Sequence, residues 1–541
     1  MLDGEATMTL DAIRRDLSVD EAWRHLERIA EEIPSRLAGS PNARRMAEYA
    51  HDALGRAGLA SRMQEFPGLV SFPETALIRV LAPERREIAA NTLGHSASTD
   101  GLEGELVYVG SGAESEYAGK EVRGKITLSE LSYSPARHEK ALIAWRQGSI
   151  AQVMMNWGDE SNQAVPFGSI KSAWGNPTPE ALASEMPDLP CVGIARTEGL
   201  RLKQRCLEGP VRIWLRARAS NGWHPLTMTS AELTAGAGQF MLLGGHMDSW
   251  PGPQASDNAA GSACILELAR VFARQRGELR RGLVVGLWMG HETGTMVSSS
   301  RFADVNWDRL RRGCVAYLQI DQPAIAGSST WRLDSTDEAA SYLARATREV
   351  VGDAPIYTAR MRRTGDTSFF GVGLPTIAGI MSFSDAEIER TALATLGWWH
   401  HSLENTLDKV DKGRLALHLQ VYARWMWDLL TAPLLPFEYA PMAERLASRV
   451  GELAGREVPE IELASVAERA RELRELAAHL DGRVEAERAR LAGGAGEQVA
   501  ELLNGAMLQL SRALVPIAST VVGPYGQDRY GHAWQSSAIP A

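Results

Sequence analysis

The sequence predicts an α/β fold in which helices cover both faces of a mostly parallel sheet. Strand-like and helix-like patterns alternate over residues 223–435, which is typical of sheets built from strand and helix units. Residues 76–222 are instead rich in short β-like runs, and residues 436–541 turn to Ala, Leu, Glu and Arg. We therefore expect an α/β core, made by residues 1–75 and 223–435, with a β-rich insertion and a C-terminal helical domain.

The N-terminal part of the core is expected to be helical. Apolar side chains recur among charged ones at helical spacing, at Ile13, Leu17, Leu26 and Ile29. Ser18 is placed to cap the second of two helices before residue 60.

The insertion is predicted from its β-rich runs at residues 105–109, 124–128 and 150–155, with a helical stretch at 137–147 between the last two. The C-terminal domain is predicted as a helical hairpin or small bundle. There, Leu473, Leu476 and Leu480 share one helical face. The pair Gly493-Gly494 then interrupts the pattern.

Composition narrows the class of protein. A chain of 541 residues with 45% hydrophobic residues is large enough for two or three domains with sizeable cores. The formal net charge of -10 gives no basic footprint, so we expect no nucleic-acid and no membrane partner. A small-molecule or short peptide substrate fits better.

The sequence also indicates a cytoplasmic protein. The N-terminus begins with acidic residues and lacks an apolar signal core, and no later run reaches the roughly 20 apolar residues that span a bilayer. The four cysteines show no CxxC spacing, so we expect reduced thiols without a chemical role.

Candidate metal ligands follow the predicted strands of the core. The strand-like runs 240–243, 283–289 and 315–320 are each followed by residues of this kind, where open α/β sheets gather their functional groups. The five candidates are His246, Asp257, Glu292, Asp321 and His401. One carboxylate could bridge two cations while imidazoles and further carboxylates complete each shell, and such mixed nitrogen and oxygen shells suit zinc. We expect Asp248, two residues past His246, to orient that ring.

Six short segments carry a resemblance to metallopeptidase family 28. They are residues 245–250, 256–258, 291–294, 319–321, 365–368 and 401–406. The family contains dinuclear-zinc aminopeptidases, glutamate carboxypeptidases and metal-free transferrin receptors. The resemblance implies that His246 and Asp321 hold one ion, that Glu292 and His401 hold the other, and that Asp257 bridges them.

The flanking regions resemble other parts of larger family members. The insertion resembles their protease-associated domain, which overhangs the active site; the alternative is a spacer that touches no substrate. The C-terminal segment resembles the dimerisation domain of the glutamate carboxypeptidase branch, which implies a homodimer. Arg529 and Tyr530 fall where that branch holds a substrate carboxylate, although a basic-aromatic pair in a polar tail is also common.

One position departs from the family pattern. Where the family has two adjacent glutamates, the first of them the general base, this chain has His291-Glu292. An imidazole accepts a proton near neutral pH, its ordinary pKa being about 6.5, so His291 could replace that base. It could instead ligate a metal or only contact substrate.

Two further interpretations concern the residues around this site. His400 stands where the family often has tyrosine, and it could donate a hydrogen bond to an oxyanion or be a packed neighbour. Asp366 is expected to line the same cleft, while Arg360, Arg362 and Arg363 are expected to form a solvated face rather than an anion site.

Two functions follow as hypotheses. The first is a metal-dependent hydrolase with two divalent ions, Zn²⁺ ahead of Mn²⁺ or Co²⁺, that cleaves an amide C–N bond with His291 as base. An aminopeptidase, a carboxypeptidase and a specialised amidohydrolase all stay open. The second is a non-catalytic, receptor-like binding protein, which the five intact ligand positions disfavour.

Overall fold

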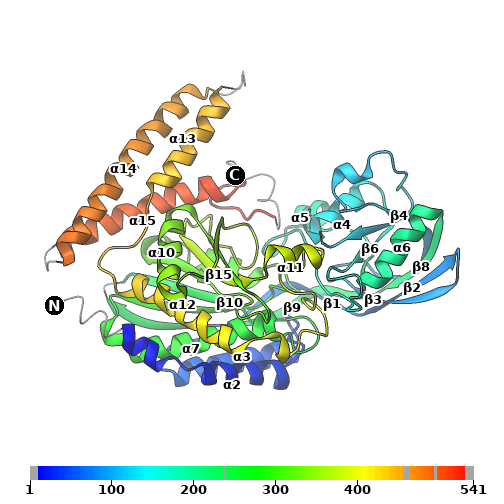
Figure 1. Ribbon diagram of the computed structural model, residues 1–541, viewed down its shortest axis with the longest axis horizontal. Helices are drawn as coiled ribbons and strands as arrows, with labels where there is room; N and C mark the ends of the chain where they lie inside the picture. The colour runs from blue at the N-terminus through cyan, green and yellow to red at the C-terminus, as the bar shows by residue number, and fades with distance from the viewer. Residues whose placement is uncertain (1–9, 133, 237, 456–461, 493–495, 530–541) are drawn as a thin grey trace.

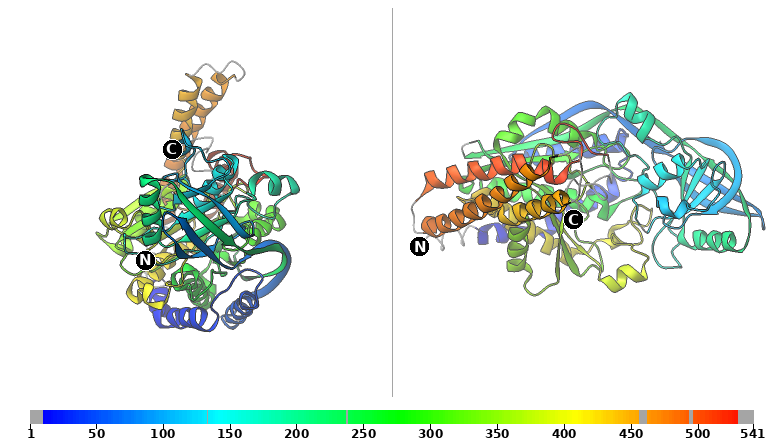
Figure 2. Two further views of the ribbon diagram at one scale, coloured as in Figure 1. Left: turned by 90° about the vertical axis from the view of Figure 1, so that its right-hand side faces the viewer. Right: turned by 90° about the horizontal axis from the view of Figure 1, so that it is seen from above.

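The structure is a computed structural model that describes residues 10–132, 134–236, 238–455, 462–492 and 496–529. A mixed α/β core lies at the centre, a β-barrel lies at one end, and a pair of long helices stands off the opposite end (Figure 1). The side view in Figure 2 shows the same helical pair projecting from the body. Among the described residues, no helix is long and apolar enough to span a membrane.

The core is built on an eight-stranded sheet with the order β1-β9-β11-β10-β12-β15-β13-β14. Its strands are β1 (Ala60–Pro73), β9 (Ala219–Gly236), β10 (Phe240–His246), β11 (Arg281–Trp288), β12 (Cys314–Gln319), β13 (Thr330–Ser335), β14 (Ile356–Arg360) and β15 (Thr376–Ser382). The central strands β11, β10, β12 and β15 are parallel, and β13 is parallel to β14. The antiparallel pairs are β1 with β9, β9 with β11, and β13 with β15. The sheet is therefore mixed, with most of its strand pairs parallel as predicted. Two of the antiparallel pairs arise because β1 carries the chain out to the barrel and β9 brings it back.

Helices cover both faces of this sheet, as predicted. They are α2 (Val19–Glu27), α3 (Pro41–Arg56), α7 (Ala260–Arg274), α8 (Val297–Val305), α9 (Trp307–Gly313), α10 (Ala340–Val351), α11 (Asp385–Arg390) and α12 (Lys412–Thr431). A Cβ on Gly245 would meet Ile265 of α7, whereas one on Gly244 would meet Trp288, whose ring packs on Phe302 of α8. Because successive strand residues face opposite sides, α7 and α8 lie on opposite faces.

The N-terminal region holds one helix more than expected. Residues 10–16 are helical, and Ser18 caps α2 by accepting a hydrogen bond from the Glu21 amide at 3.2 Å, as predicted. The additional helix is α3, whose buried face consists mainly of Ala43, Ala47 and Ala50. Such small side chains gave no apolar pattern that the sequence analysis detected.

The region between β1 and β9 forms a closed barrel with its own apolar core. Its strands are β2 (Thr75–Ala82), β3 (Arg86–Thr92), β4 (Thr99–Tyr108), β5 (Ile126–Glu130), β6 (Ala151–Met155), β7 (Cys191–Ile194) and β8 (Val211–Ala217), and its helices are α4 (Arg137–Arg146), α5 (Pro179–Glu185) and α6 (Arg196–Glu208). The three predicted strands and the predicted helix correspond to β4, β5, β6 and α4. Its identity as a protease-associated domain stays a prediction.

The C-terminal region consists of α13 (Ala440–Ala454), α14 (Ala464–Ala492) and α15 (Glu497–Ser519). Helices α13 and α14 pack together as the projecting pair, while α15 lies back on the core. The predicted apolar face of α14 was partly wrong: Leu476 is 68% exposed, because the buried line runs through Ala477 and Val484. The Gly493-Gly494 break lies outside the described residues.

Candidate functional site

The five predicted ligands come together at the carboxyl ends of the central strands. His246 ends β10, Glu292 lies in the turn after β11, and Asp321 follows β12. Asp257 lies in the loop before α7, and His401 belongs to a loop in which it adopts a left-handed backbone with φ of 56°. The sheet thus brings candidate ligands from distant parts of the chain together at the carboxyl ends of its parallel strands, as expected.

The distances between these side chains place Asp257 in the middle of the cluster. Its Oδ1 lies 3.2 Å from His246 Nε2, and its Oδ2 lies 3.1 Å from His401 Nε2. On one side, His246 Nε2 is also 3.3 Å from Asp321 Oδ1. On the other, His401 Nε2 is 3.1 Å from Glu292 Oε1. Each oxygen of the Asp257 carboxylate therefore faces its own set of candidate ligand atoms.

The hydrogen bonding at this cluster fits divalent metal ions. Four of its buried atoms lack a hydrogen-bond partner among the described residues: His246 Nε2, Asp257 Oδ2, Glu292 Oε1 and Asp321 Oδ1. Buried polar atoms are rarely left in this state, because each costs about 1–3 kcal/mol. Cations bound between them would satisfy all four, and nitrogen with carboxylate oxygen is a donor set that zinc accepts.

Electrostatics within the cluster favour charged groups. Burial alone would lower the pKa of His246, but the carboxylates of Asp321 and Asp257 raise it well above its ordinary value. Burial would likewise raise the pKa of Glu292, but the neighbouring His401 lowers it to about 2. The carboxylates are therefore ionised, and the imidazoles would release their protons when cations bind.

Asp248 has a role different from the predicted one. The ring of His246 is oriented by the backbone carbonyl of Asp248, 3.0 Å from Nδ1, while the carboxylate Oδ1 lies 3.9 Å away. The carboxylate instead accepts hydrogen bonds from the backbone N–H groups of His291 and Glu292, at 3.1 and 2.9 Å. Asp248 therefore fixes the turn that carries the base candidate and a ligand.

His291 is paired with Asp366. Its Nδ1 lies 2.9 Å from Asp366 Oδ2, and its ring stacks on that of His246 with 3.9 Å between centroids. The other carboxylate oxygen accepts a hydrogen bond from Ser299 Oγ at 2.7 Å. Burial would raise the pKa of Asp366, but His291 lowers it, so the carboxylate is ionised.

His400 lies inside the cluster rather than at its rim. It is 5% exposed, and its Nδ1 is 3.2 Å from Asp257 Oδ2. Its ring stacks on that of His401 with 3.8 Å between ring centroids, and its centroid lies 5.5 Å from that of Trp157. Burial lowers its pKa to about 3, so the imidazole is neutral.

The barrel region lines part of the site. An open hollow beside the ligands is lined by Arg137, His138, Ser169 and Lys171 together with His291, Glu292, Met296 and His401. Arg137 begins α4, and its Nη2 lies 3.5 Å from His401 Nδ1. The backbone N–H of Phe167 donates to the carbonyl of His401 at 2.6 Å.

Sequence reasoning missed Lys171, Ser299 and Arg36. The Lys171 ammonium donates to the backbone carbonyls of His291 and Glu292, and burial lowers its pKa to about 8. The buried Arg36 donates to the Met247 carbonyl at 3.1 Å and supports the loop after β10. No local motif marks the role of Lys171 or Arg36 at the site, since the site segments that they contact lie more than 100 residues away in the sequence.

Two predictions on basic residues are changed or left open. Arg363 is buried, donates to the Thr367 carbonyl at 2.7 Å and lies 4.1 Å over the Trp174 ring, so it is no part of a solvated face. Arg362 is exposed. Arg529 lies near Glu139 of α4, whose pKa it lowers against the larger effect of burial. Tyr530 lies outside the described residues, so the pocket that it would form with Arg529 stays a prediction.

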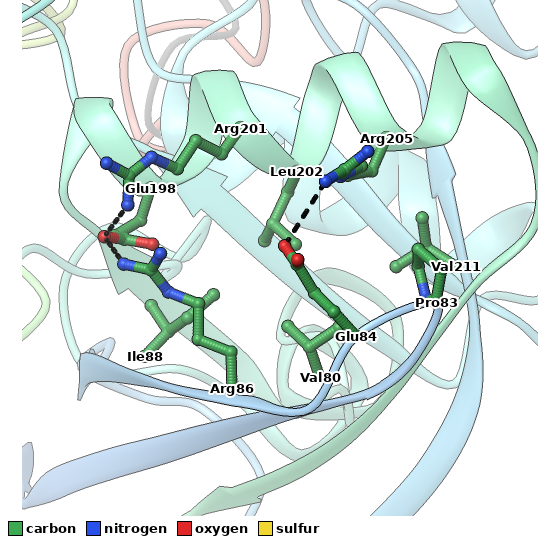
Figure 3. A pocket seen from close by; sticks show the side chains of 10 residues that line it. All are labelled: Val80, Pro83, Glu84, Arg86, Ile88, Glu198, Arg201, Leu202, Arg205 and Val211. Carbon is green, nitrogen blue, oxygen red and sulfur yellow. Dashed lines mark hydrogen bonds and ion pairs between the residues drawn. The ribbon is translucent and has the colours of Figure 1, made fainter.

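A second hollow lies on the barrel beside α6, as Figure 3 shows. Its arginines point toward glutamates: Arg86 and Arg201 pair with Glu198, and Arg205 pairs with Glu84. Ion pairs of this kind at a surface contribute little and carry no chemistry. The candidate site is therefore the cluster at the sheet edge.

The α/β sheet and the clustered ligands at its edge define a metal-dependent hydrolase. The chain matches the model of peptidase family M28 over residues 229–426. It is 22% identical to aminopeptidase YwaD of Bacillus subtilis, over 73% of this chain and 81% of that protein. It is 25% identical to carboxypeptidase Q of Xenopus laevis, over 52% of this chain and 61% of that protein.

Solved structures share the fold. A peptidase M28 precursor from Shewanella amazonensis superposes with a TM-score of 0.62 at 21% identity, covering 79% of this chain and 97% of that chain. The zinc aminopeptidase BSAP from Bacillus subtilis gives a TM-score of 0.58 at 18% identity, over 77% and 96% of the two chains.

Proposed function

We propose that this protein is a dinuclear-zinc hydrolase that cleaves an amide C–N bond, with His291 as the general base. The observation that carries the proposal is that buried ligand atoms without hydrogen-bond partners gather around the two oxygens of Asp257. His291, which is paired with Asp366, lies beside them. Mn²⁺ and Co²⁺ are the alternative metals for such a donor set.

The residues divide into two ligand sets. His246 and Asp321 would hold one ion, Glu292 and His401 the other, and Asp257 both. When bound, the ions would polarise the substrate carbonyl and lower the pKa of the attacking water.

His291 would take the proton from that water. Because the ionised Asp366 can only accept a hydrogen bond, Nδ1 of His291 carries a proton and Nε2 has a free lone pair. A ring nitrogen of His291 lies within 4.8 Å of the ligand atoms of His246 and Asp321. Asp366 would orient this base, as a buried aspartate orients a histidine in other hydrolases.

The substrate class that we propose is a small amide or short peptide. The zinc aminopeptidase and carboxypeptidase relatives support peptide-like substrates, and the exchange of glutamate for histidine as base favours a specialised amide. No observation at the site favours the receptor-like alternative.

Metal analysis of the purified chain tests this proposal, followed by a screen of aminoacyl and N-acyl amides on the loaded protein. We expect about two zinc ions per chain and metal-dependent hydrolysis. Asp257→Ala should lose both ions, because the bridging carboxylate serves each of them. A wild-type chain that binds none of Zn²⁺, Mn²⁺ and Co²⁺ would exclude the hydrolase. One full ion in Asp257→Ala would exclude the bridge.

A further inference from the structure

The buried nitrogen of His400 is the one feature of the cluster that the five expected ligands leave unexplained. Its Nδ1 has no hydrogen-bond partner among the residues that the structure describes, just like the buried ligand atoms His246 Nε2 and Asp321 Oδ1. By contrast, His291 Nδ1 is satisfied by Asp366. A buried imidazole nitrogen that faces the other candidate ligand atoms without a hydrogen-bond partner is placed as a metal ligand would be.

We propose that His400 is a sixth metal ligand and completes, through Nδ1, the shell of the ion held by Asp257, Glu292 and His401. This inference rests on the proposed dinuclear site. It assigns to the chain a ligand set with one imidazole more than the family resemblance implies.

The distances agree with a shared ion. Ligand atoms around a tetrahedral zinc ion lie roughly 3.3 Å apart, given bonds of about 2.0–2.1 Å. Asp257 Oδ2 lies 3.2 Å from His400 Nδ1 and 3.1 Å from His401 Nε2, and the latter atom lies 3.1 Å from Glu292 Oε1. The ligand atoms of Asp257, His400 and His401 all lie within 4.8 Å of one another.

A simple hydrogen bond from His400 to Asp257 does not account for this arrangement. Although the two atoms are 3.2 Å apart, neither forms a hydrogen bond within the described part of the chain. The stacking of His400 on His401 holds both rings with their nitrogens toward the same carboxylate oxygen. The atoms His400 Nδ1, His401 Nε2 and Asp257 Oδ2 are therefore arranged as three ligands of one ion would be.

With His400 as a ligand, the two ions would differ in the number of protein ligands that hold them. Four protein ligands would close a tetrahedral shell, which is the arrangement of firmly held zinc ions. The ion held by His246, Asp257 and Asp321 would keep an open position for water and substrate. One ion should therefore bind first and more tightly than the other.

The test is a zinc titration of the metal-free, full-length chain against a chromophoric chelator. Wild type should show two unequal steps. His400→Phe keeps a stacked ring without a nitrogen and should weaken the tighter step by at least about 100-fold, beyond the effect typical of residues outside the ligand shell. Trp157→Phe, which disturbs the packing of the same ring, should stay within a few fold of wild type.

A second variant separates a ligand from a hydrogen-bond donor. His400→Gln keeps an N–H donor but loses the imidazole nitrogen, so it should also lose the tight step and change the visible absorption of the Co²⁺-loaded protein. If either variant keeps wild-type affinity and the wild-type spectrum, His400 is not a ligand. If wild type itself binds no metal, the dinuclear site fails instead, and the two failures are distinct.

Discussion

At the scale of single residues, the proposed site differs from the pattern of metallopeptidase family 28 at the position of its proposed base, residue 291. The imidazole of His291 stands in place of a carboxylate, and Asp366 holds it at 2.9 Å. A carboxylate base needs no orienting partner for its proton, but an imidazole does, because only one of its two nitrogens can be the acceptor. His291 and Asp366 should therefore act as a unit.

A double-mutant cycle tests that unit. His291→Ala should lower kcat by about 10²- to 10⁴-fold, the usual contribution of a general base. Asp366→Asn should cost a similar factor, because an amide can donate to Nδ1 and favour the wrong tautomer. The double variant should be little worse than either single one, as residues of one unit are not additive. Steady-state kinetics on the zinc-loaded proteins measures all three.

Two outcomes would contradict this interpretation. Fully additive losses would mean that Asp366 acts independently of His291. Loss of a zinc ion in His291→Ala would make His291 a ligand. Ser299→Ala is the matched control, because it leaves the His291–Asp366 pair in place and removes the hydrogen bonds of Ser299 Oγ to the far oxygen of Asp366, to Ser368 Oγ and to the Met296 carbonyl. It should cost much less.

At the scale of elements, the turn after β11 is held from two sides. Asp248, after β10, binds its N–H groups, and Lys171, from the loop after β6, binds its carbonyls. The barrel region is thereby coupled to the position of His291 and Glu292.

Replacing Lys171 by methionine should break this coupling. Two buried carbonyls would lose their donor, so we expect a loss of about 1–3 kcal/mol in unfolding free energy and weaker zinc binding. Denaturant unfolding and zinc titration measure both effects. Lys203→Met is the control, because Lys203 pairs with Glu130 inside the barrel, away from the site. Unchanged zinc affinity in Lys171→Met would show that the turn does not need the barrel.

A second element-scale prediction concerns Glu338, buried where the short helix Asp337–Ala339 meets α13. Burial raises its pKa to about 7 from an ordinary value near 4.5. Because the folded state holds the proton more tightly, this group lowers stability as pH rises from about 4.5 to 7, by up to about 3 kcal/mol. Glu338→Gln should remove that loss.

Urea unfolding at pH 5 and pH 8 checks the prediction. The stability of Glu338→Gln relative to wild type should increase between these pH values. A constant difference would show that Glu338 is ionised in the folded protein throughout this range.

The sequence allowed the ligands to be predicted better than their surroundings. His246, Glu292 and Asp321 follow apolar strands directly, so local pattern and sheet geometry place them at one edge. The hydrogen bonds from Lys171 to the carbonyls of residues 291 and 292 form only when the barrel packs on the core, so no local sequence pattern predicts them. The antiparallel course of β1 and β9 depends likewise on where the inserted barrel lies.

At the scale of the whole molecule, the helical pair α13 and α14 stands off the body (Figure 1). Helix α14 presents apolar side chains to solvent. Val466 is 45% exposed and Leu476 is 68% exposed. A two-fold symmetric contact would cover the same patch on both copies. We therefore expect residues 440–515 to mediate a homodimer.

Light scattering at micromolar concentration tests the dimer, and the wild-type chain should give about twice its mass of 58.9 kDa. Leu476→Arg should shift the mass toward the single chain, because a buried charge at a two-fold contact meets its own copy or apolar surface. Leu207→Arg, at an equally exposed leucine on the barrel, should leave the mass unchanged. A monomeric wild type would exclude the dimer, and a dimeric Leu476→Arg variant would move the contact away from this face of α14.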